Sequence, residues 1–155
     1  MDISKVFSPD AQRALDIFAR KIPFNQLMGF EFFHPQPDRT ALKFDMREEL
    51  VGNFMRGNLH GGVISSALDV VGGMVAFVSV LSKQADANEE IDVNAFAKLG
   101  TIDIRVDYLR PGFGNHFVAT GYNLRTGSKV AVSRMELHND ESELIAVGTG
   151  AYIVG

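Results

Sequence analysis

The sequence predicts an α+β fold in which one antiparallel sheet curls around a single long helix. Residues 58–81 read NLHGGVISSALDVVGGMVAFVSVL and are almost wholly apolar. Segments with the patterns of two strands precede this stretch, and segments with the patterns of four strands follow it. A helix that is apolar on every face is normally buried on every face. A sheet wrapped around the helix supplies that burial.

The N-terminal part of the chain predicts an amphipathic helix. Ser8 is a favourable N-cap residue and Pro9 is suited to the first helical position. Apolar residues then recur at three-to-four spacing, which predicts a helix over about residues 8–22. Pro23 ends this helix, and one further turn is expected over residues 24–28.

A hairpin and a loop are expected before the central helix, and a polar interval after it. Residues 30–34 and 39–46 read as two strands joined by turn residues at 35–38. Residues 50–57 form the loop into the helix. The polar interval 82–100 allows a short second helix and reads either as a lid or binding loop or as a solvated excursion.

After Gly100 the apolar residues alternate with polar ones, which is the pattern of half-buried strands. Four strands are expected, at 102–108, 117–124, 130–138 and 144–154. Short turn-forming segments separate the last three, which are therefore expected to be consecutive antiparallel neighbours.

Composition limits the class of protein. The 155 residues are expected to form one domain, 1–155. A formal charge of −4 argues against a broad surface for nucleic acid or an anionic membrane. The absence of cysteine excludes disulfides, thiolate catalysis and cysteine-held metals. The N-terminus lacks the apolar run of a signal peptide, so a cytoplasmic location is expected.

The central stretch is also the one candidate for a membrane span, because it has about the ~20 residues that a bilayer requires. Asp69 near its centre would cost roughly 2.5 to 3.5 kcal/mol on insertion scales. Its glycines and serines, and the strands that follow, also favour a buried core helix. No stable membrane insertion is expected.

The central helix carries two groups suited to catalysis. Free backbone N–H groups at its start, at Gly61, can bind an oxyanion, and the Asp69 carboxylate can act as a base. Their separation is roughly 12 Å along the axis, whereas groups that cooperate must both lie within about 3 Å of the reacting centre. Cooperation therefore requires two antiparallel copies of the helix, which predicts a two-fold dimer with two shared sites.

Three features together resemble those of the PaaI-like hotdog-fold acyl-CoA thioesterases, most closely the YigI-type members. The first is Asn58-Leu59-His60-Gly61-Gly62, the second is the acid Asp69 nine residues after His60, and the third is TIDIRVDYLRPG at residues 101–112. The resemblance covers roughly residues 24–155. It implies a hotdog fold with a sheet of about six strands, hydrolysis of a fatty or aryl acyl-CoA to free acid and CoA, and a homodimer or a dimer of dimers.

The resemblance also implies roles for single residues. The Gly61 N–H would polarise the thioester carbonyl, and Asp69 of the partner subunit would activate water or attack the carbonyl directly. Thr101 would orient the water, and His60 would help to hold the thioester. Asn53 would correspond to an amide of the family, although it stands one residue further from His-Gly-Gly than in the compared members.

The remaining implied contacts are to the substrate. Gly62 would line the substrate site, where the simpler explanation is close packing. The phosphates of coenzyme A need cations, for which Arg110 and Lys129 are the candidates ahead of Arg105 and Arg125. Arg110 and Lys129 could also be ordinary surface charges. The acyl chain would lie against the central helix and the dimer interface.

Two other functions remain open. A hotdog hydratase or dehydratase would need a histidine facing the carboxylate, and that histidine would have to be His60 across the dimer. A non-catalytic acyl-CoA sensor would use the same pocket without turnover. In either case, and for the thioesterase as well, Asp69 could instead be a structural acid bonded to backbone groups.

Other chemistries lack their motifs. Ser65 and Ser66 stand in no G-x-S-x-G elbow. The four histidines have no metal-ligand spacing, and the glycines after residue 111 lack the dinucleotide fingerprint. No metal or redox cofactor is therefore expected, with coenzyme A entering as part of the substrate.

Overall fold

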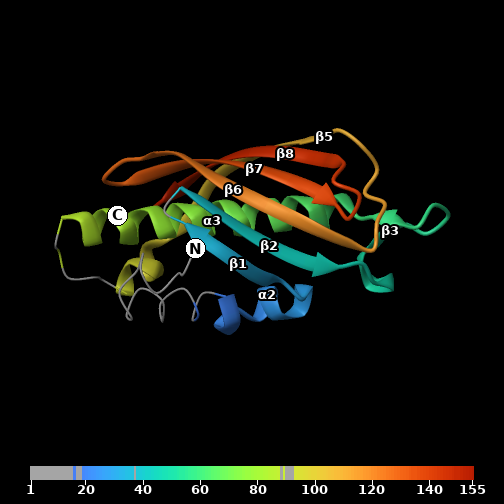
Figure 1. The fold of residues 1–155 in the computed structure, drawn as a ribbon, viewed down its shortest axis with the longest axis horizontal. Helices are drawn as coiled ribbons and strands as arrows, with labels where there is room; N and C mark the ends of the chain where they lie inside the picture. Colours follow the sequence, from blue (N-terminus) through green and yellow to red (C-terminus); the bar gives the residue numbers. More distant parts are fainter. Residues whose placement is uncertain (1–15, 17–18, 37, 88, 90–92) are drawn as a thin grey trace.

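A computed structural model of the chain describes residues 16, 19–36, 38–87, 89 and 93–155 (Figure 1). The helices are α2 (Pro23–Met28) and α3 (Gly61–Asp86), with the short 3₁₀ turns η2 (Glu48–Leu50) and η3 (Val93–Lys98). The strands are β1 (Glu31–Gln36), β2 (Arg39–Asp45), β3 (Val51–Asn53), β4 (Asn58–Leu59), β5 (Gly100–Tyr108), β6 (His116–Thr126), β7 (Val130–Asn139) and β8 (Leu144–Ile153). Six strands form one antiparallel sheet in the order β1-β2-β6-β7-β8-β5, and β3 pairs with β4 apart from it.

The four strands that end the chain confirm the period-two pattern. Their boundaries differ from the predicted ones by at most two residues. β6, β7 and β8 are neighbours in chain order, and the N–H of Gly127 donates to the carbonyl of Val130 in the turn between β6 and β7. Among the described residues β5 pairs with β8 alone, so it is an edge strand of the sheet.

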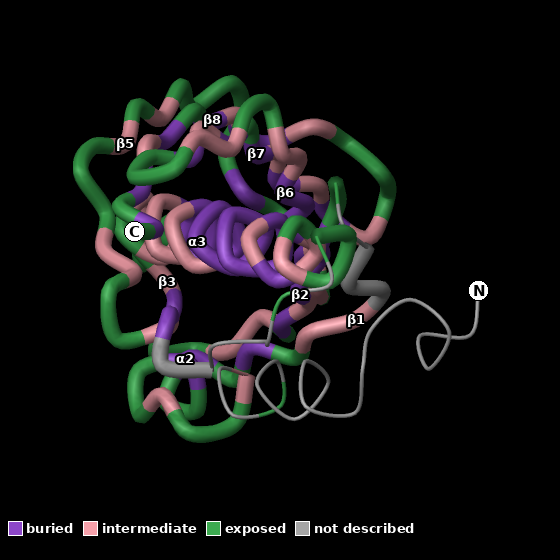
Figure 2. Tube along the Cα trace, turned by 90° about the vertical axis from the view of Figure 1, so that its left-hand side faces the viewer, coloured by how far each residue is buried: buried purple, intermediate pink, exposed green. Residues whose placement is uncertain are grey.

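The helix α3 lies in the concave face of the sheet, which curls around it (Figures 1 and 2). Every residue from 71 to 79 is buried. Leu68 and Val71 belong to the main apolar cluster, together with the rings of Phe30, which precedes β1, Phe44 of β2 and Phe117 of β6. The centroid of the Phe44 ring lies 5.4 Å from those of both Phe30 and Phe117. The prediction of a long helix wrapped by one antiparallel sheet is therefore confirmed.

The first turns of α3 are less buried than the sequence predicted. The side chains of Val63, Ser66, Asp69 and Val70 are only partly covered, and Gly62 is exposed. The cause is the extent of the sheet, because no described strand lies beyond the β5 edge. The expectation that α3 is buried on nearly all sides therefore holds only for its central residues 71–79.

The helix α3 is long and apolar enough to cross a membrane, with a mean hydropathy of 2.0 over its most apolar window. In the fold, 67% of that window is buried inside the protein. Packing against the sheet therefore accounts for the apolar composition of the helix.

The connections hold the main differences from the predicted elements. The helix α3 continues past Leu81 to Asp86, and the predicted loop 50–57 contains the small β3–β4 hairpin. The short helix expected in the polar interval is the turn η3. The predicted helix over residues 8–22 lies mostly outside the described residues, of which 16 and 19–21 are helical.

The extra turn predicted before Gly29 is the helix α2, with Pro23 at its start. Gly29 ends the helix with a φ of 69°, a left-handed conformation that glycine adopts without strain. Arg47 Nη1 donates to the carbonyl of Met28 at 3.0 Å. This bond ties α2 to the segment that leads into the β3–β4 hairpin.

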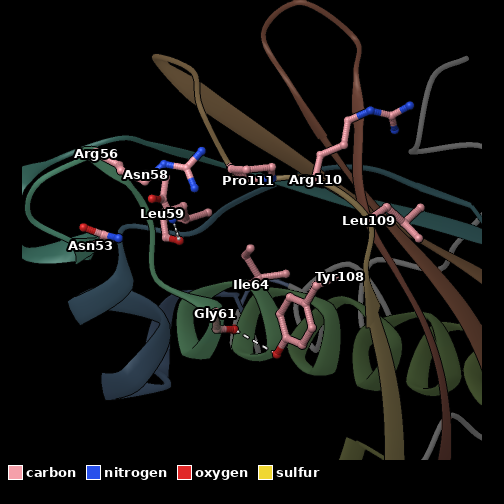
Figure 3. Close-up of a pocket in the computed structure, with 11 residues that line it drawn as sticks. Asn53, Arg56, Asn58, Leu59, Gly61, Ile64, Tyr108, Leu109, Arg110 and Pro111 are labelled. Atoms are coloured by element: carbon pink, nitrogen blue, oxygen red, sulfur yellow. Dashed lines mark hydrogen bonds between the residues drawn. The ribbon is translucent and has the colours of Figure 1, made fainter.

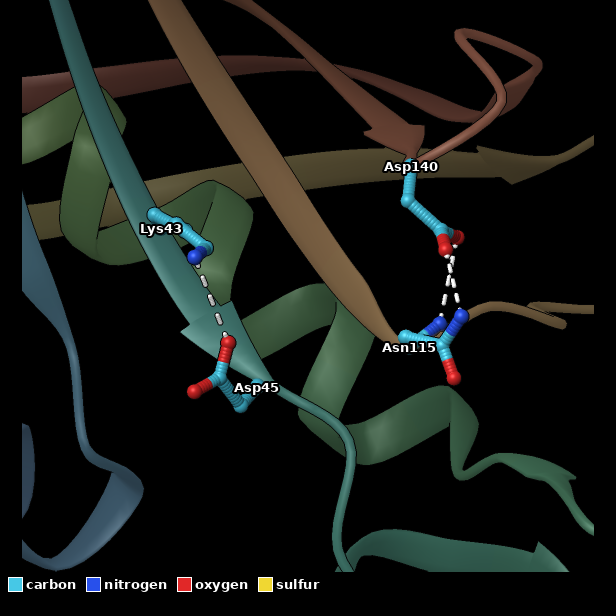
Figure 4. A network of polar contacts seen from close by, with 4 residues as sticks. All are labelled: Lys43, Asp45, Asn115 and Asp140. Atoms are coloured by element: carbon cyan, nitrogen blue, oxygen red, sulfur yellow. Dashed lines mark hydrogen bonds and ion pairs between the residues drawn. The ribbon is translucent and has the colours of Figure 1, made fainter.

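Polar contacts fasten one end of the sheet (Figure 4). Asn115 donates to Asp140 twice, from its backbone N–H at 3.1 Å and from its side-chain amide at 2.8 Å, which joins the β5–β6 connection to the β7–β8 turn. The side-chain bond from Asn115 lowers the pKa of the Asp140 carboxyl below its ordinary value. Lys43 and Asp45 form an exposed ion pair on β2, with 3.4 Å between Nζ and Oδ1.

Candidate active site

The start of α3 is capped by the side chain of His60. Its backbone has an extended conformation, with φ −68° and ψ 136°, and its Nδ1 accepts a hydrogen bond from the Gly62 N–H at 2.8 Å. This acceptor role places the proton of a neutral imidazole on Nε2. The N–H of Gly61 has no hydrogen-bond partner among the residues that the structure describes. It is therefore a free donor at the positive end of the helix dipole.

A cavity of about 400 Å³ opens beside this helix start (Figure 3). It lies between the β3–β4 loop, the first turn of α3 and the segment that follows β5. Its lining residues are Asn53, Arg56, Asn58, Leu59, Gly61, Ile64, Tyr108, Leu109, Arg110, Pro111 and Gly112. The sequence analysis placed three of them, Asn53, Gly61 and Arg110, in the site.

Tyr108 forms the wall of the cavity nearest the helix start. Its hydroxyl donates to the carbonyl of Gly61 at 3.2 Å. A Cβ atom at Gly61 would lie 3.5 Å from the Tyr108 ring, which is ordinary contact. Sequence reasoning missed this residue, although it ends the period-two run of β5 immediately before Leu109.

Asn53 shapes the loop as well as lining the cavity. Its side-chain oxygen accepts the N–H of Met55 at 3.1 Å, and its backbone carbonyl accepts the N–H groups of Arg56 and Gly57. Part of its hydrogen-bonding capacity is thus used to form the turn. The tip of this turn exposes Phe54.

The cation that sequence reasoning missed is Arg56. Its guanidinium carbon lies 5.8 Å from the centroid of the Phe113 ring, a cation–π distance. Figure 3 shows its side chain between Asn58 and Pro111, at the cavity. The signal in the sequence is a basic residue next to the turn glycine, Gly57, on the way to the helix start.

The two predicted cations do not meet within one protomer. Arg110 lines the cavity, but its Nη1 donates to the carbonyl of Leu144 at 2.7 Å, and its guanidinium points away from Gly61 in Figure 3. Lys129 lies in the turn at the other end of β6, where its carbonyl accepts the N–H of Val154. The length of β6 separates the two residues by about 30 Å.

The other two arginines considered lie away from the cavity. Arg105 pairs with Asp107 on β5 at 3.1 Å, with an exposed side chain. Arg125 is exposed near the end of β6.

Asp69 lies on the partly covered face of α3, away from the cavity lining. Its Oδ1 accepts a hydrogen bond from the hydroxyl of Thr101 at 2.9 Å. Thr101 is the second residue of β5, the edge strand. The two residues that the sequence analysis paired as acid and water-orienting hydroxyl are thus in contact.

Tyr152 contacts Asp69 from inside the protein. Its hydroxyl donates to the backbone carbonyl of Asp69 at 3.2 Å. Burial, and after it the nearby Asp69, raises the pKa of the Tyr152 phenol. The sequence analysis had assigned Tyr152 only to a strand.

Apart from Lys129, which lies in the turn after β6, the predicted site residues gather at two positions along α3. Asn53, His60, Gly61, Gly62 and Arg110 gather at the start of α3. Asp69 and Thr101 lie further along, at a distance from Gly61 of about 12 Å on the helix rise. Among the described residues, no group of three or more His, Asp or Glu side chains could hold a metal ion.

A long helix in the concave face of a six-stranded antiparallel sheet defines a hotdog-fold protein. Its site combines an uncapped helix N–H beside a cavity with a carboxylate that accepts a hydroxyl bond. The chain belongs to the thioesterase superfamily, because its residues 56–146 match that family.

Relatives across nearly the whole chain agree with this assignment. Proteins of Escherichia coli (strain K12) and Salmonella typhimurium, both named medium/long-chain acyl-CoA thioesterase YigI, are 44% identical to this chain over 140 residues, covering 90% of each chain. The predicted resemblance to YigI-type members is therefore confirmed.

Solved structures agree as well. A crystal structure of a Shewanella oneidensis protein related to the thioesterase superfamily is 41% identical, covers 95% of this chain and 99% of its own, and has a TM-score of 0.88. The E. coli PaaI protein from the phenylacetic acid degradation operon, at 16% identity, shares the fold with a TM-score of 0.77 over 96% of both chains.

Proposed function

We propose that the chain is an acyl-CoA thioesterase that hydrolyses acyl-CoA to the free acid and CoA. Membership of the thioesterase superfamily and 44% identity to proteins named medium/long-chain acyl-CoA thioesterase support the reaction. The observation that carries the mechanism is the 2.9 Å bond from Thr101 to Asp69 Oδ1 on a partly open face of α3. That bond holds one carboxylate oxygen and leaves Oδ2 for a water molecule or for the substrate carbonyl.

In the proposed reaction the Gly61 N–H donates to the thioester oxygen and stabilises the negative charge that develops there. Asp69 takes a proton from a water molecule whose oxygen attacks the carbonyl carbon, with Thr101 orienting the water. The C–S bond breaks, and the CoA thiolate takes up the proton that Asp69 accepted, which restores the carboxylate. In the alternative route Asp69 attacks the carbonyl carbon directly, the C–S bond breaks with departure of the CoA thiolate, and water then hydrolyses the resulting anhydride.

The site is proposed to form between two protomers. Gly61 and Asp69 of one helix are too far apart to reach one carbonyl, at about 12 Å. Two features of the fold suit a second copy: the unpaired outer edge of β5 and the partly covered face of α3 beside it. A two-fold axis that sets the helices antiparallel gives two equal sites, each with Gly61 from one protomer and Asp69 from its partner.

The coenzyme A end of the substrate is proposed to bind in the cavity at the helix start. Arg56 and Arg110 would supply positive charge for the phosphates, once Arg110 exchanges its bond to Leu144 for the substrate. Lys129 is near Thr101 through the strand pairing, because Val130 pairs with Ile153, which pairs with Gly100. Lys129 would therefore reach a shared site from the protomer that donates Asp69.

The acyl end is proposed to lie along α3 at the interface, and the names of the relatives favour a medium or long chain. Gly62 and His60 would flank the thioester, with the imidazole Nε2 proton free to donate because Nδ1 accepts from Gly62. The same bond occupies the Nδ1 lone pair, which disfavours a role for His60 as general base in the hydratase alternative. We also propose a cytoplasmic location and activity without metal, redox cofactor, membrane insertion or nucleic acid.

Thiol release tests the proposed reaction. The full chain should release CoA from a panel of acyl-CoAs of increasing length, without added metal. Asp69→Asn should lose the activity, and Asp45→Asn, an exposed acid on β2, should keep it. Release of no thiol from any member of the panel, with reversible binding retained, would favour the sensor alternative.

A mixing experiment tests whether two protomers share each site. Gly61→Pro removes the N–H at a position where proline is tolerated, after a His60 backbone already extended as proline requires. Gly61→Pro and Asp69→Asn homodimers should both be inactive. Exchange of their protomers should restore about one quarter of wild-type activity, because half of the dimers are mixed and each has one intact site. No recovery in dimers proven to be mixed would overturn the shared site.

A further inference from the structure

We propose that Tyr152 is a positioning residue for the reaction, whose buried hydroxyl fixes the helical turn that carries Asp69. The inference rests on the proposed role of Asp69. It assigns a function to a tyrosine that neither binds substrate nor reaches the reacting atoms.

The hydrogen bond of Tyr152 joins β8 of the sheet to α3 at Asp69. Tyr152 is only 1% exposed, and its hydroxyl donates to the backbone carbonyl of Asp69. A carbonyl oxygen has two lone pairs, so it can accept this bond in addition to the helical one. The raised pKa of the phenol keeps the hydroxyl protonated and able to donate.

Asp69 is held at two points by neighbouring residues of paired strands. Thr101 on β5 and Tyr152 on β8 are direct Cα partners in the sheet. The hydroxyl of Thr101 bonds to the carboxylate of Asp69, and the hydroxyl of Tyr152 bonds to its main chain. With both bonds made, the carboxylate has little freedom to move along or around the helix axis.

The helix is built to admit the tyrosine. A Cβ atom at Gly72 would lie 2.2 Å from the Tyr152 hydroxyl oxygen and 2.9 Å from the sulfur of Met135. A Cβ at Gly150, on β8 itself, would lie 2.8 Å from the same hydroxyl. Glycine in a helix interior is unfavourable, and at Gly72 the close approach of Tyr152 is the reason for it.

A second hydroxyl provides the matched control. Ser133 on β7 is fully buried and donates to the carbonyl of Gly72 at 3.1 Å. It makes the same kind of bond from the sheet to α3, but not to Asp69. Tyr152→Phe and Ser133→Ala therefore each remove one buried hydroxyl bond to the helix. Only Tyr152→Phe removes a bond to Asp69 and so allows its carboxylate to move.

The test compares kcat and KM for acyl-CoA hydrolysis. Tyr152→Phe should lower kcat by about tenfold, the scale of one lost hydrogen bond, with KM within about twofold of wild type. The thermal midpoints of Tyr152→Phe and Ser133→Ala should both fall, but Ser133→Ala should keep the wild-type kcat. In Thr101→Val, the further change Tyr152→Phe should cost less than it does alone, because both act through Asp69.

A second variant approaches the same contact from the helix. Gly72→Ala displaces the Tyr152 hydroxyl without altering the tyrosine, and it should reproduce the fall in kcat. If folded Tyr152→Phe and Gly72→Ala both retain wild-type kcat while Asp69→Asn is inactive, the positioning role is wrong and the proposed function stands. If Asp69→Asn is itself fully active, the proposed function fails, and this inference fails with it.

Discussion

The two halves of α3 differ in what surrounds them. Residues 71–79 are buried without exception: Met74 and Phe77 pack in one apolar cluster with Ala95, and Ala76 packs in another with Tyr152 of β8. Residues 61–70 alternate between buried positions such as Leu68 and partly open ones such as Asp69. One helix therefore combines a segment that stabilises the fold with a segment that keeps polar groups available for chemistry.

The comparison shows how an acid can sit in an apolar helix. In the buried segment 71–79 an uncompensated carboxylate would carry a large desolvation cost. Asp69 instead lies two residues before the buried segment 71–79, where its face remains partly open and Thr101 supplies a donor. Asp69 remains partly open because, among the described residues, the sheet ends at β5 and no further strand covers this face of α3.

The largest expected effect is on activity in the first half of the helix. Asp69→Asn preserves the size of the side chain and should lower kcat by about a thousandfold, within the range for loss of a general base. Its thermal midpoint should stay close to that of the wild type, because the position is partly open. Thiol release and thermal unfolding of the same preparation measure both, and a variant that unfolds early would make Asp69 a structural acid.

The next effect is on stability in the second half. Leu81 is fully buried, and Leu81→Ala should lower the free energy of unfolding by about 3 kcal/mol through lost burial and the cavity left behind. The kcat of the folded fraction should be unchanged. Chemical denaturation measures the first quantity, and thiol release normalised to folded protein measures the second. A large fall in kcat would remove the functional difference between the two halves.

A smaller effect is expected at the cavity beside the helix start. Arg56→Ala should raise KM for acyl-CoA by about tenfold and leave kcat nearly unchanged, because a phosphate contact contributes to binding in ground and transition states alike. Arg134→Ala, on β7 beside Glu136, is the control. Added salt should raise the KM of the wild type more than that of Arg56→Ala. Equal KM values for the two variants would contradict an anion site here.

The smallest effect concerns the fastening of the sheet end. The pKa of Asp140 is lowered in the folded protein, so its bond to Asn115 stabilises the fold above the unfolded pKa of about 3.9 and is lost as the pH falls through the folded value. The thermal midpoint of Asp140→Asn should therefore lie below that of the wild type near neutral pH and approach it below about pH 3. A constant difference at all pH values would contradict the assignment.

Much of the fold could be predicted from local patterns. Alternation after Gly100 identified β5 to β8, and a wholly apolar stretch identified α3. The end of α3 was placed too early because residues 82–86 are mostly polar, and polarity there reflects exposure rather than the loss of the helix. The β3–β4 hairpin was missed because its strands are too short to alternate.

Only the part of the candidate site that depends on a sequence motif or on the spacing along the helix could be predicted. His60, Gly61 and Asp69 were identified by the His-Gly-Gly motif with its acid nine residues later, and the helical rise per residue gave the distance from Gly61 to Asp69. Arg56 and Tyr152 required the fold, since a local pattern does not say which strand pairs with which. The same limit applies to Lys129, which resembles Arg110 in lying beside a turn but is found at the opposite end of β6.

The spacing between Gly61 and Asp69 has a consequence for how the proposed enzyme would be assayed. If neither protomer can complete a site alone, the rate per milligram becomes a function of protein concentration. Dilution below the dissociation constant of the dimer should abolish the activity while each separated chain remains folded. Specific activity followed across a dilution series would then report the strength of the association directly.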